Sequence, residues 1–182
     1  MNGHIRQKEQ SRQMIENALF ELLDEKEYSR LTVSEIVKRA DVARRTFYRL
    51  YGNKDSIIHN YFERLCNDYQ NNYPPIERYD IKQVAKDYFS FWYTQREQLL
   101  KFHRAGLDDM LYYGINNAST AVIRRRIGDE CLRYNTELEY FAGYSTGGFI
   151  NLLIGWIDKG MKETPEKYAE MVSKAILKYV SG

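Results

Sequence analysis

Apolar side chains recur three or four positions apart along most of this 182-residue chain, which is the spacing of an amphipathic helix. No stretch alternates apolar and polar side chains as a half-buried β-strand does. The pattern therefore predicts an all-α protein. With 43% hydrophobic residues the chain is long enough for one or two compact domains, and we expect an N-terminal domain over residues 1–60 and a C-terminal domain over residues 61–182.

The pattern of the N-terminal region predicts four helices: two short ones, with one supporting helix before them and one after them in the sequence. Apolar spacing over residues 11–23 indicates a first helix that covers the others, and the polar residues 1–9 are expected to form a mobile arm. A later helix, with Asn53 as its cap, continues to Tyr69. The paired prolines at 74–75 cannot continue a helix, so this helix is expected to end before them and to connect the two domains.

Between these two helices the pattern predicts a helix-turn-helix. The first short helix has four apolar residues at helical spacing, with Thr32 ahead of them as a candidate N-cap. It breaks at residues 41–43, where Asp41 is expected to take an unusual backbone angle that a short polar side chain tolerates. The apolar positions of the two helices are Val33, Ile36, Val37 and Ala40, then Phe47, Leu50 and Tyr51.

The polar face of the second short helix is strongly basic. Residues 38–54 hold six Lys and Arg against one acid, although the whole chain carries only +2. Arginines near the start of a recognition helix reach base edges in the major groove and pair with guanine through two hydrogen bonds. Arg44, Arg45 and Thr46 occupy those positions. Lys54 lies at a helix start, a position that favours anions such as phosphate.

Each of these residues also has a purely structural interpretation. Arg44 and Arg49 can be solvated surface residues. Tyr48 can be a half-buried packing residue, and Lys54 can lie exposed at a helix end. The constellation argues for a DNA surface more strongly than any single member.

This motif, residues 31–57, resembles the DNA-binding domain of the TetR/AcrR family of bacterial transcriptional regulators. The resemblance rests on T-V-x-x-I-V-x-x-A-x-V, T-F-Y-R-L-Y and N-K-D-S-I, whose mutual spacing also agrees. It implies that residues such as Thr32, Tyr48 and Lys54 hold phosphates, while the first residues of the second helix approach bases. The predicted DNA contacts are Thr32, Arg44, Arg45, Thr46, Tyr48, Arg49 and Lys54.

The sequence departs from the family pattern at three positions. Asp41 replaces the usual turn glycine, Ala43 replaces the usual cap serine, and Arg45 replaces a frequent small residue. The hydroxyl that serves a capping or phosphate contact in the family is therefore missing at Ala43. Arg45 suggests a base or phosphate contact particular to this protein.

Helical spacing continues through the C-terminal region. One apolar face covers residues 81–92, and a shorter segment follows around residues 99–102. A further helix begins at Leu107, and we expect residues 114–117 to interrupt it before it resumes at Val122.

The last two predicted helices carry a second clear signal. Seven positions from Tyr134 to Trp156 follow one another at intervals of three or four residues, and four glycines between 143 and 155 would let another helix approach closely. Each such glycine costs about 1 kcal/mol relative to alanine, so a packing partner is expected. Thr164 and Pro165 then start a final amphipathic helix.

Two such helices from each of two chains would form a four-helix bundle, and the family resemblance implies that they form a homodimer. The same apolar stripes can instead pack only within one chain. The predicted interface residues are Phe149, Leu152, Trp156, Tyr168, Met171, Val172, Ala175, Ile176 and Tyr179.

Aromatic residues of the C-terminal domain are candidates for a ligand pocket. The resemblance implies that a small molecule entering this domain changes the separation of two DNA-binding heads and weakens operator binding. Aromatic residues at helical spacing are more often core, and that is the preferred interpretation of each one. The candidate ligand contacts are Tyr88, Trp92, Tyr112, Tyr113, Tyr140, Phe141 and Tyr144.

The remaining charged and reactive residues indicate no catalytic, cofactor or metal site. There is no Gly-rich phosphate loop, no H-E-x-x-H and no nucleophile elbow, and three histidines are few for acid-base chemistry. Cys66 and Cys131 lack metal-binding spacing and are interpreted as core residues. The run at 124–126, three arginines, is interpreted as a solvated face, with an anion or partner surface as the alternative.

These patterns predict a DNA-binding transcriptional regulator and not an enzyme. We expect a repressor that binds a roughly palindromic operator as a homodimer, with release by a small-molecule effector as one mode of control. The alternative is a helical DNA-binding regulator controlled by a protein partner, with no small-molecule ligand. No stretch is apolar enough for a signal peptide or a membrane span, so a cytoplasmic location is expected.

Overall fold

The computed structural model describes residues 3–75, 80–132 and 138–180 and contains only helices, turns and loops within them. The prediction of an all-α fold is thereby confirmed for this part of the chain. The helices are α1 (Gly3–Glu25), α2 (Val33–Arg39), α3 (Arg44–Leu50), α4 (Asp55–Asn72), α5 (Ile81–Thr94), α6 (Arg96–Arg104), α7 (Asp108–Leu132), α8 (Leu138–Asp158) and α9 (Pro165–Val180), with a 3₁₀ turn at Tyr28–Arg30.

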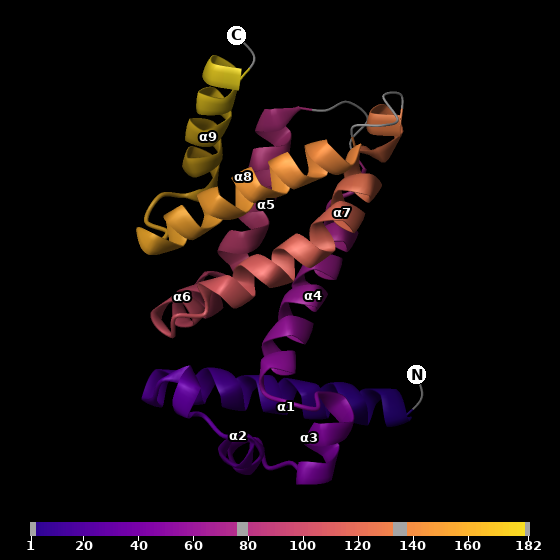
Figure 1. The fold of residues 1–182 in the computed structure, drawn as a ribbon, viewed down its shortest axis with the longest axis vertical. Coiled ribbons are helices and arrows are strands. Elements are labelled where there is room, and N and C mark those ends of the chain that lie inside the picture. Colours follow the sequence, from indigo (N-terminus) through magenta and orange to yellow (C-terminus); the bar gives the residue numbers. More distant parts are fainter. Residues whose placement is uncertain (1–2, 76–79, 133–137, 181–182) are drawn as a thin grey trace.

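The helices form two groups that α4 connects (Figure 1). We call α1–α3 the head and α5–α9 the body. In the head, α2 and α3 lie on the side of α1 that faces away from the body, at one end of the molecule. The connecting helix α4 packs against α7 of the body. Within the body, α7 packs against α8 and α5 against α9. None of the described helices is both long and apolar enough to cross a bilayer.

The expected mobile arm at residues 1–9 is wrong for the residues that the structure describes, because α1 begins at Gly3. This segment contains no proline, and its Arg, Gln, Lys and Glu residues are good helix formers. Once the apolar residues further along fix the first helical turns, each added residue gains a hydrogen bond at low cost. The Ser11 hydroxyl also donates to the carbonyl of Gln7 at 3.0 Å, inside the extended helix.

The expected break at residues 114–117 is also wrong, because α7 runs through it without interruption. Gly114 is there for close packing: a Cβ built on it would lie 2.6 Å from the Cβ of Phe62 on α4. The intrinsic cost of a helical glycine is therefore offset by the contact between α7 and α4. A single-residue propensity cannot show that contact.

Candidate nucleic-acid interface and body cavity

The start of α2 is fixed by a capping box, as Thr32 predicted. The Thr32 hydroxyl accepts from the Glu35 N–H at 3.3 Å, and the Thr32 N–H donates to the Glu35 carboxylate at 2.9 Å. Lys26 pairs with the same carboxylate, and this pair together with Thr32 lowers the pKa of Glu35 to about 2. The polar groups of Thr32 are thus already used within the head.

The turn between α2 and α3 has the geometry expected for Asp41. Its φ is 51°, in the left-handed region, which confirms the prediction of an unusual backbone angle there. The next residue closes the turn, since the Val42 N–H donates to the Val37 carbonyl at 3.1 Å. Ala43 then precedes α3 without any side-chain cap.

Helix α3 presents its basic face outward from the head. Phe47 and Tyr51 are buried against the core below, whereas Arg44, Arg45 and Arg49 are exposed. Tyr48 is 47% exposed and lies on the outer side with them. Within the described residues no ion pair involves any of the three arginines, so their charge is free for an external anion. Thr46 is half-buried at the edge of this face.

Two of the six basic residues counted in the sequence are already engaged elsewhere in the head. Arg39 pairs with Glu25 at 2.8 Å and with Glu21 at 3.3 Å, which lowers the pKa of Glu25. The ammonium of Lys54 donates to the carbonyls of Tyr28 at 2.8 Å and Leu31 at 3.0 Å. The partners of Arg39 and Lys54 all lie before residue 38, so a charge count over residues 38–54 cannot identify these contacts.

A buried ion pair supports α3 from below. Glu16 on α1 is 1% exposed and receives both guanidinium arms of Arg64 on α4, one of them at 2.8 Å. The hydroxyl of Tyr51, at the end of α3, donates to the same carboxylate at 3.1 Å. Burial, with the Glu16 charge nearby, raises the pKa of Tyr51. Three helices of the head and its connection therefore meet at one carboxylate.

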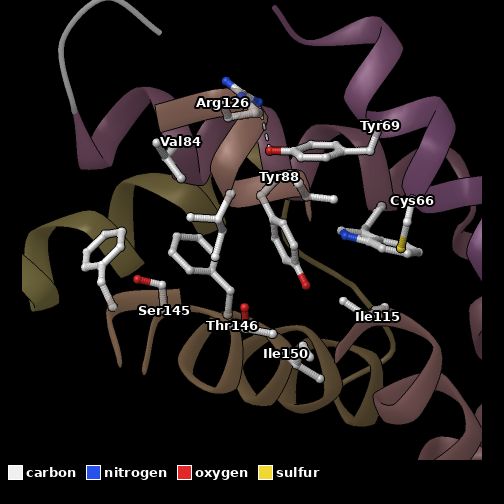
Figure 2. Close-up of a pocket in the computed structure, with 14 residues that line it drawn as sticks. Cys66, Tyr69, Val84, Tyr88, Ile115, Arg126, Ser145, Thr146 and Ile150 are labelled. Atoms are coloured by element: carbon white, nitrogen blue, oxygen red, sulfur yellow. Dashed lines mark hydrogen bonds between the residues drawn. The ribbon is translucent and has the colours of Figure 1, made fainter. Parts of the chain in front are cut away.

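The body contains a cavity of about 100 Å³ between α4, α5, α7 and α8 (Figure 2). Of the predicted ligand contacts, three line it: Tyr88, Trp92 and Phe141. The aromatic residues that face it are joined by small polar ones on α8, Ser145 and Thr146. The structure thus brings three of the seven candidate residues together at one cavity.

The other four predicted ligand contacts do not line the cavity. Tyr140 is 79% exposed, Tyr113 and Tyr144 are also exposed, and Tyr112 is half-buried elsewhere. Successive helical residues point about 100° apart, so the turn of α8 that directs Phe141 inward directs its neighbour Tyr140 outward. Aromatic content alone cannot distinguish these directions.

Arg126 is not on a solvated face, which corrects the interpretation of the arginine run. It is 5% exposed, pairs with Asp87 of α5 at 2.6 Å and donates to the Tyr69 hydroxyl at 2.8 Å. Asp87 also accepts from Gln83 at 2.6 Å. A signal for this pair was present in the sequence, because Asp87 lies three residues after Val84 and four before Phe91, on the apolar side of its helix.

Two hydroxyls at the cavity have no hydrogen-bond partner within the described residues. They belong to Tyr88 and Thr146, and both oxygen atoms are fully buried. Trp92 lies beside Tyr88, but an indole N–H can only donate, so the Tyr88 proton still lacks an acceptor. Burial raises the pKa of Tyr88 well above its ordinary value. Burial also raises the pKa of the nearby Cys66 thiol to about 12.

Several predicted interface residues lie inside the subunit. Trp156 is 0% exposed and stacks on Tyr168 with ring centroids 4.7 Å apart, and Val172 is buried near them. Phe149, Leu152 and Ile176 pack partly against the same core. The apolar stripes of α8 and α9 are used largely by α5 and its Phe89, so they do not all face a partner. Met171, Ala175 and Tyr179 are exposed; Tyr134 lies outside the described residues.

Two family models together match most of the chain. Residues 15–61 match the family described as bacterial regulatory proteins, tetR family, and residues 79–178 match a transcriptional regulator C-terminal region. The uncharacterized HTH-type transcriptional regulator YxbF of Bacillus subtilis (strain 168) is 24% identical over 170 residues, which cover 87% of this chain and 42% of that protein. The chain thus spans less than half the length of this curated relative.

Two solved structures resemble the whole described chain. The dihydroxyacetone kinase operon activator DhaS superposes with a TM-score of 0.63 and 16% identity, over 94% of this chain and 96% of that one. The fatty acid degradation regulator FadR from Bacillus halodurans has a TM-score of 0.58 and 18% identity, over 92% and 94%. At these identities the similarity shows a shared fold alone.

Proposed function

This chain belongs to the TetR family of bacterial transcriptional regulators, and from that premise we propose that it binds an operator duplex as a homodimer through the outer face of α3. Membership of a family of regulators also agrees with the expectation that the chain is not an enzyme. The observation that carries the proposal is the set of exposed arginines at 44, 45 and 49, which have no acidic partner in the described part of the chain.

We assign the contacts by position on α3. Arg44, Arg45 and Thr46 lie in its first turn and are the proposed readers of base edges. Tyr48 and Arg49 follow on the same exposed face and are the proposed phosphate contacts. Thr32 and Lys54 were predicted to hold phosphates, but their polar groups bond within the head. We therefore propose that these two residues mainly position α2 and α4 beside the sugar-phosphate backbone of the DNA.

A homodimer is the arrangement that would place two α3 helices in successive major grooves, about 34 Å apart on a roughly palindromic operator. Exposed apolar residues on α8 and α9 support it, namely Tyr140, Tyr144, Met171, Leu177 and Tyr179. The α8 glycines support it too, because a Cβ built on any of the four would meet nothing within 4 Å in this chain. Of the predicted interface we retain Met171, Ala175, Ile176 and Tyr179.

The body cavity favours control by a small-molecule effector over control by a protein partner alone. Helix α4 supplies both Cys66 at the cavity and Arg64 beneath α3, two residues apart, so a displacement of this helix by a ligand in the cavity has a direct route to the head. We propose residues 1–60 as the DNA-binding part and residues 61–182 as the regulatory and dimerisation part, although α4 itself runs through that boundary. We further propose repression, by occupation of the operator in the cytoplasm.

The test begins with selection of bound fragments from genomic DNA, followed by mobility-shift titration of the selected site and a scrambled site. Tyr48→Phe should weaken binding to both sites equally, by roughly threefold to tenfold. Arg45→Ala should weaken the selected site by about 1–3 kcal/mol more than the scrambled one. Lys162→Ala, which removes an exposed charge in the loop between α8 and α9, is the matched control and should change neither.

Binding by the unaltered chain should also fall steeply with salt, because phosphate contacts release counterions. A chain that is monomeric and binds no duplex at low ionic strength would contradict the proposal. Equal losses on both sites for Arg45→Ala would remove Arg45 as a base reader and leave it as a phosphate contact.

A further inference from the structure

The wall of the body cavity contains a charge that is already neutralised. Arg126 is the one ionised side chain among the described residues that line the cavity. Its guanidinium donates to Asp87 at 2.6 Å and to the Tyr69 hydroxyl at 2.8 Å, and it lies within 5.5 Å of the ring centroids of Tyr69 and Tyr73. The positive charge therefore has a carboxylate, a hydroxyl and two rings around it before any ligand arrives.

An anionic ligand has little to gain in such a site. A carboxylate entering the cavity would lose its hydration and would have to share the guanidinium with Asp87, whose own charge would repel it. Asp87 is itself buried and held by Gln83, so it cannot simply turn into water. An uncharged molecule meets neither obstacle and gains from burial against the apolar lining.

The opposite wall offers unused hydrogen-bonding capacity. Figure 2 shows Arg126 and Tyr69 on one side of the cavity and Ser145, Thr146 and Ile150 along α8 on the other, with Tyr88 between them. The Thr146 side chain belongs to a residue that is only 6% exposed, and its hydroxyl has no partner, nor does that of Tyr88. Each hydroxyl can both donate and accept, so a polar group on a ligand can satisfy one or the other.

We propose that the body cavity takes an uncharged, largely apolar small molecule with one hydrogen-bonding group, and that Asp87 excludes anions from it by holding Arg126. The inference deepens the proposed effector role of the body and rests on that role for its effect on DNA. At about 100 Å³ the cavity is smaller than the apolar cavity of about 150 Å³ that accommodates benzene, so the ligand must be compact, at most about one ring in size. The aromatic side chains of Tyr88, Trp92 and Phe141 favour a ring.

The first test compares three probes of similar size on the full chain without DNA, by ligand-observed NMR titration at neutral pH. Benzamide and benzoate have the same shape and differ in charge, and toluene lacks the hydrogen-bonding group. Benzamide should bind roughly tenfold more tightly than benzoate or better. Benzoate binding equal to or tighter than benzamide binding would overturn the proposal, as would absence of binding by all three probes.

Variants then assign the selectivity to residues. Asp87→Asn keeps the shape and frees the guanidinium, so benzoate should become the tighter probe, by roughly tenfold. Thr146→Val removes one hydroxyl at nearly constant shape, and should weaken benzamide several-fold while toluene is unchanged. An unaltered order of probes in folded Asp87→Asn would refute the role given to Asp87. Should that variant fail to fold, as circular dichroism would show, the comparison of probes on the unaltered chain and on Thr146→Val still decides.

Ligand binding in the cavity and DNA binding can be tested independently. Probe titration needs no operator, and the mobility-shift assay needs no probe. Selective benzamide binding in a chain that ignores every duplex would leave the cavity assignment intact and contradict the proposed function. Operator binding together with tighter binding of benzoate than of benzamide would support the proposed function and contradict the cavity assignment.

Discussion

The head and the body each contain an arginine paired with a buried carboxylate, but the two pairs have different surroundings. In the head, Glu16 bonds to Arg64 and Tyr51 and joins three helices. In the body, Arg126 pairs with Asp87 and itself lines a cavity where the Tyr88 hydroxyl has no partner. The first pair closes a packed junction, and the second borders unfilled space.

The head therefore has a fixed geometry, whereas the body has room to change. A helix that enters a DNA groove must be held rigidly by bonds behind it, and the Glu16 junction supplies them directly below α3. A site that accepts a ligand needs unfilled volume and unused hydrogen bonds, and the body retains both. The same residue types serve both purposes, because their surroundings differ.

The largest expected effect comes from breaking the head pair. Glu16→Ala should lower the free energy of unfolding by about 2–4 kcal/mol, because it leaves the Tyr51 hydroxyl and the Arg64 guanidinium, which is 34% exposed, without their shared acceptor. Urea denaturation measures the loss. Glu9→Ala is the matched control on the same helix, since Glu9 forms only an exposed pair with Arg12 at 3.5 Å, and should cost about 0.5 kcal/mol or less. Similar small values for both would show that the head does not depend on this junction.

A second prediction concerns the contact between α4 and the body. Gly114→Ala should destabilise the fold by about 1–3 kcal/mol, because its Cβ would lie 2.6 Å from that of Phe62. Asn117→Ala, three residues further along the same helix, replaces an exposed side chain and should instead stabilise the helix by about 0.5 kcal/mol. Thermal unfolding compares the two. The same sign for both variants would contradict the packing described at α7.

A third prediction separates support from DNA contact at Lys54. Lys54→Met should lower the free energy of unfolding by about 1–2 kcal/mol, because the Tyr28 and Leu31 carbonyls lose a charged donor. Arg49→Met, on the exposed face, should stay within about 0.5 kcal/mol but should reduce the salt dependence of operator binding by about one phosphate. Unchanged stability and a reduced salt slope in Lys54→Met would restore it as a phosphate contact.

A fourth prediction concerns a reaction rate and not stability, and probes whether the body cavity is closed to solvent. Alkylation requires the thiolate, and burial raises the pKa of Cys66 to about 12, so little thiolate is present at pH 8. Iodoacetamide should therefore modify Cys66 in the folded chain at least about a hundredfold more slowly than in denaturant. Peptide-resolved mass spectrometry follows the reaction. Equal rates in the two conditions would mean that this wall of the cavity opens readily.

Local patterns in the sequence were sufficient for the helix-turn-helix. Thr32 and Glu35 stand at capping-box spacing, and the apolar residues of α2 and α3 at helical spacing, so neighbours along the chain decide those elements. The left-handed Asp41 was predicted for the same reason. Predictions failed where distant elements meet: Gly114 meets Phe62 on another helix, and the extension of α1 to Gly3 depends on helix propagation from packed turns.

By itself, the sequence determined the helical fold, the basic face of α3 and the family, because periodicity, caps and motif spacing are properties of residues close together in the chain. Only the tertiary structure decided which charges remain free and which aromatic residues face the cavity. Arg39 pairs with a carboxylate on α1, Lys54 donates to carbonyls before α2, and Arg126 pairs with Asp87 on α5. Ion pairs and cavities form between side chains that are close in space, and the folded backbone alone sets those distances.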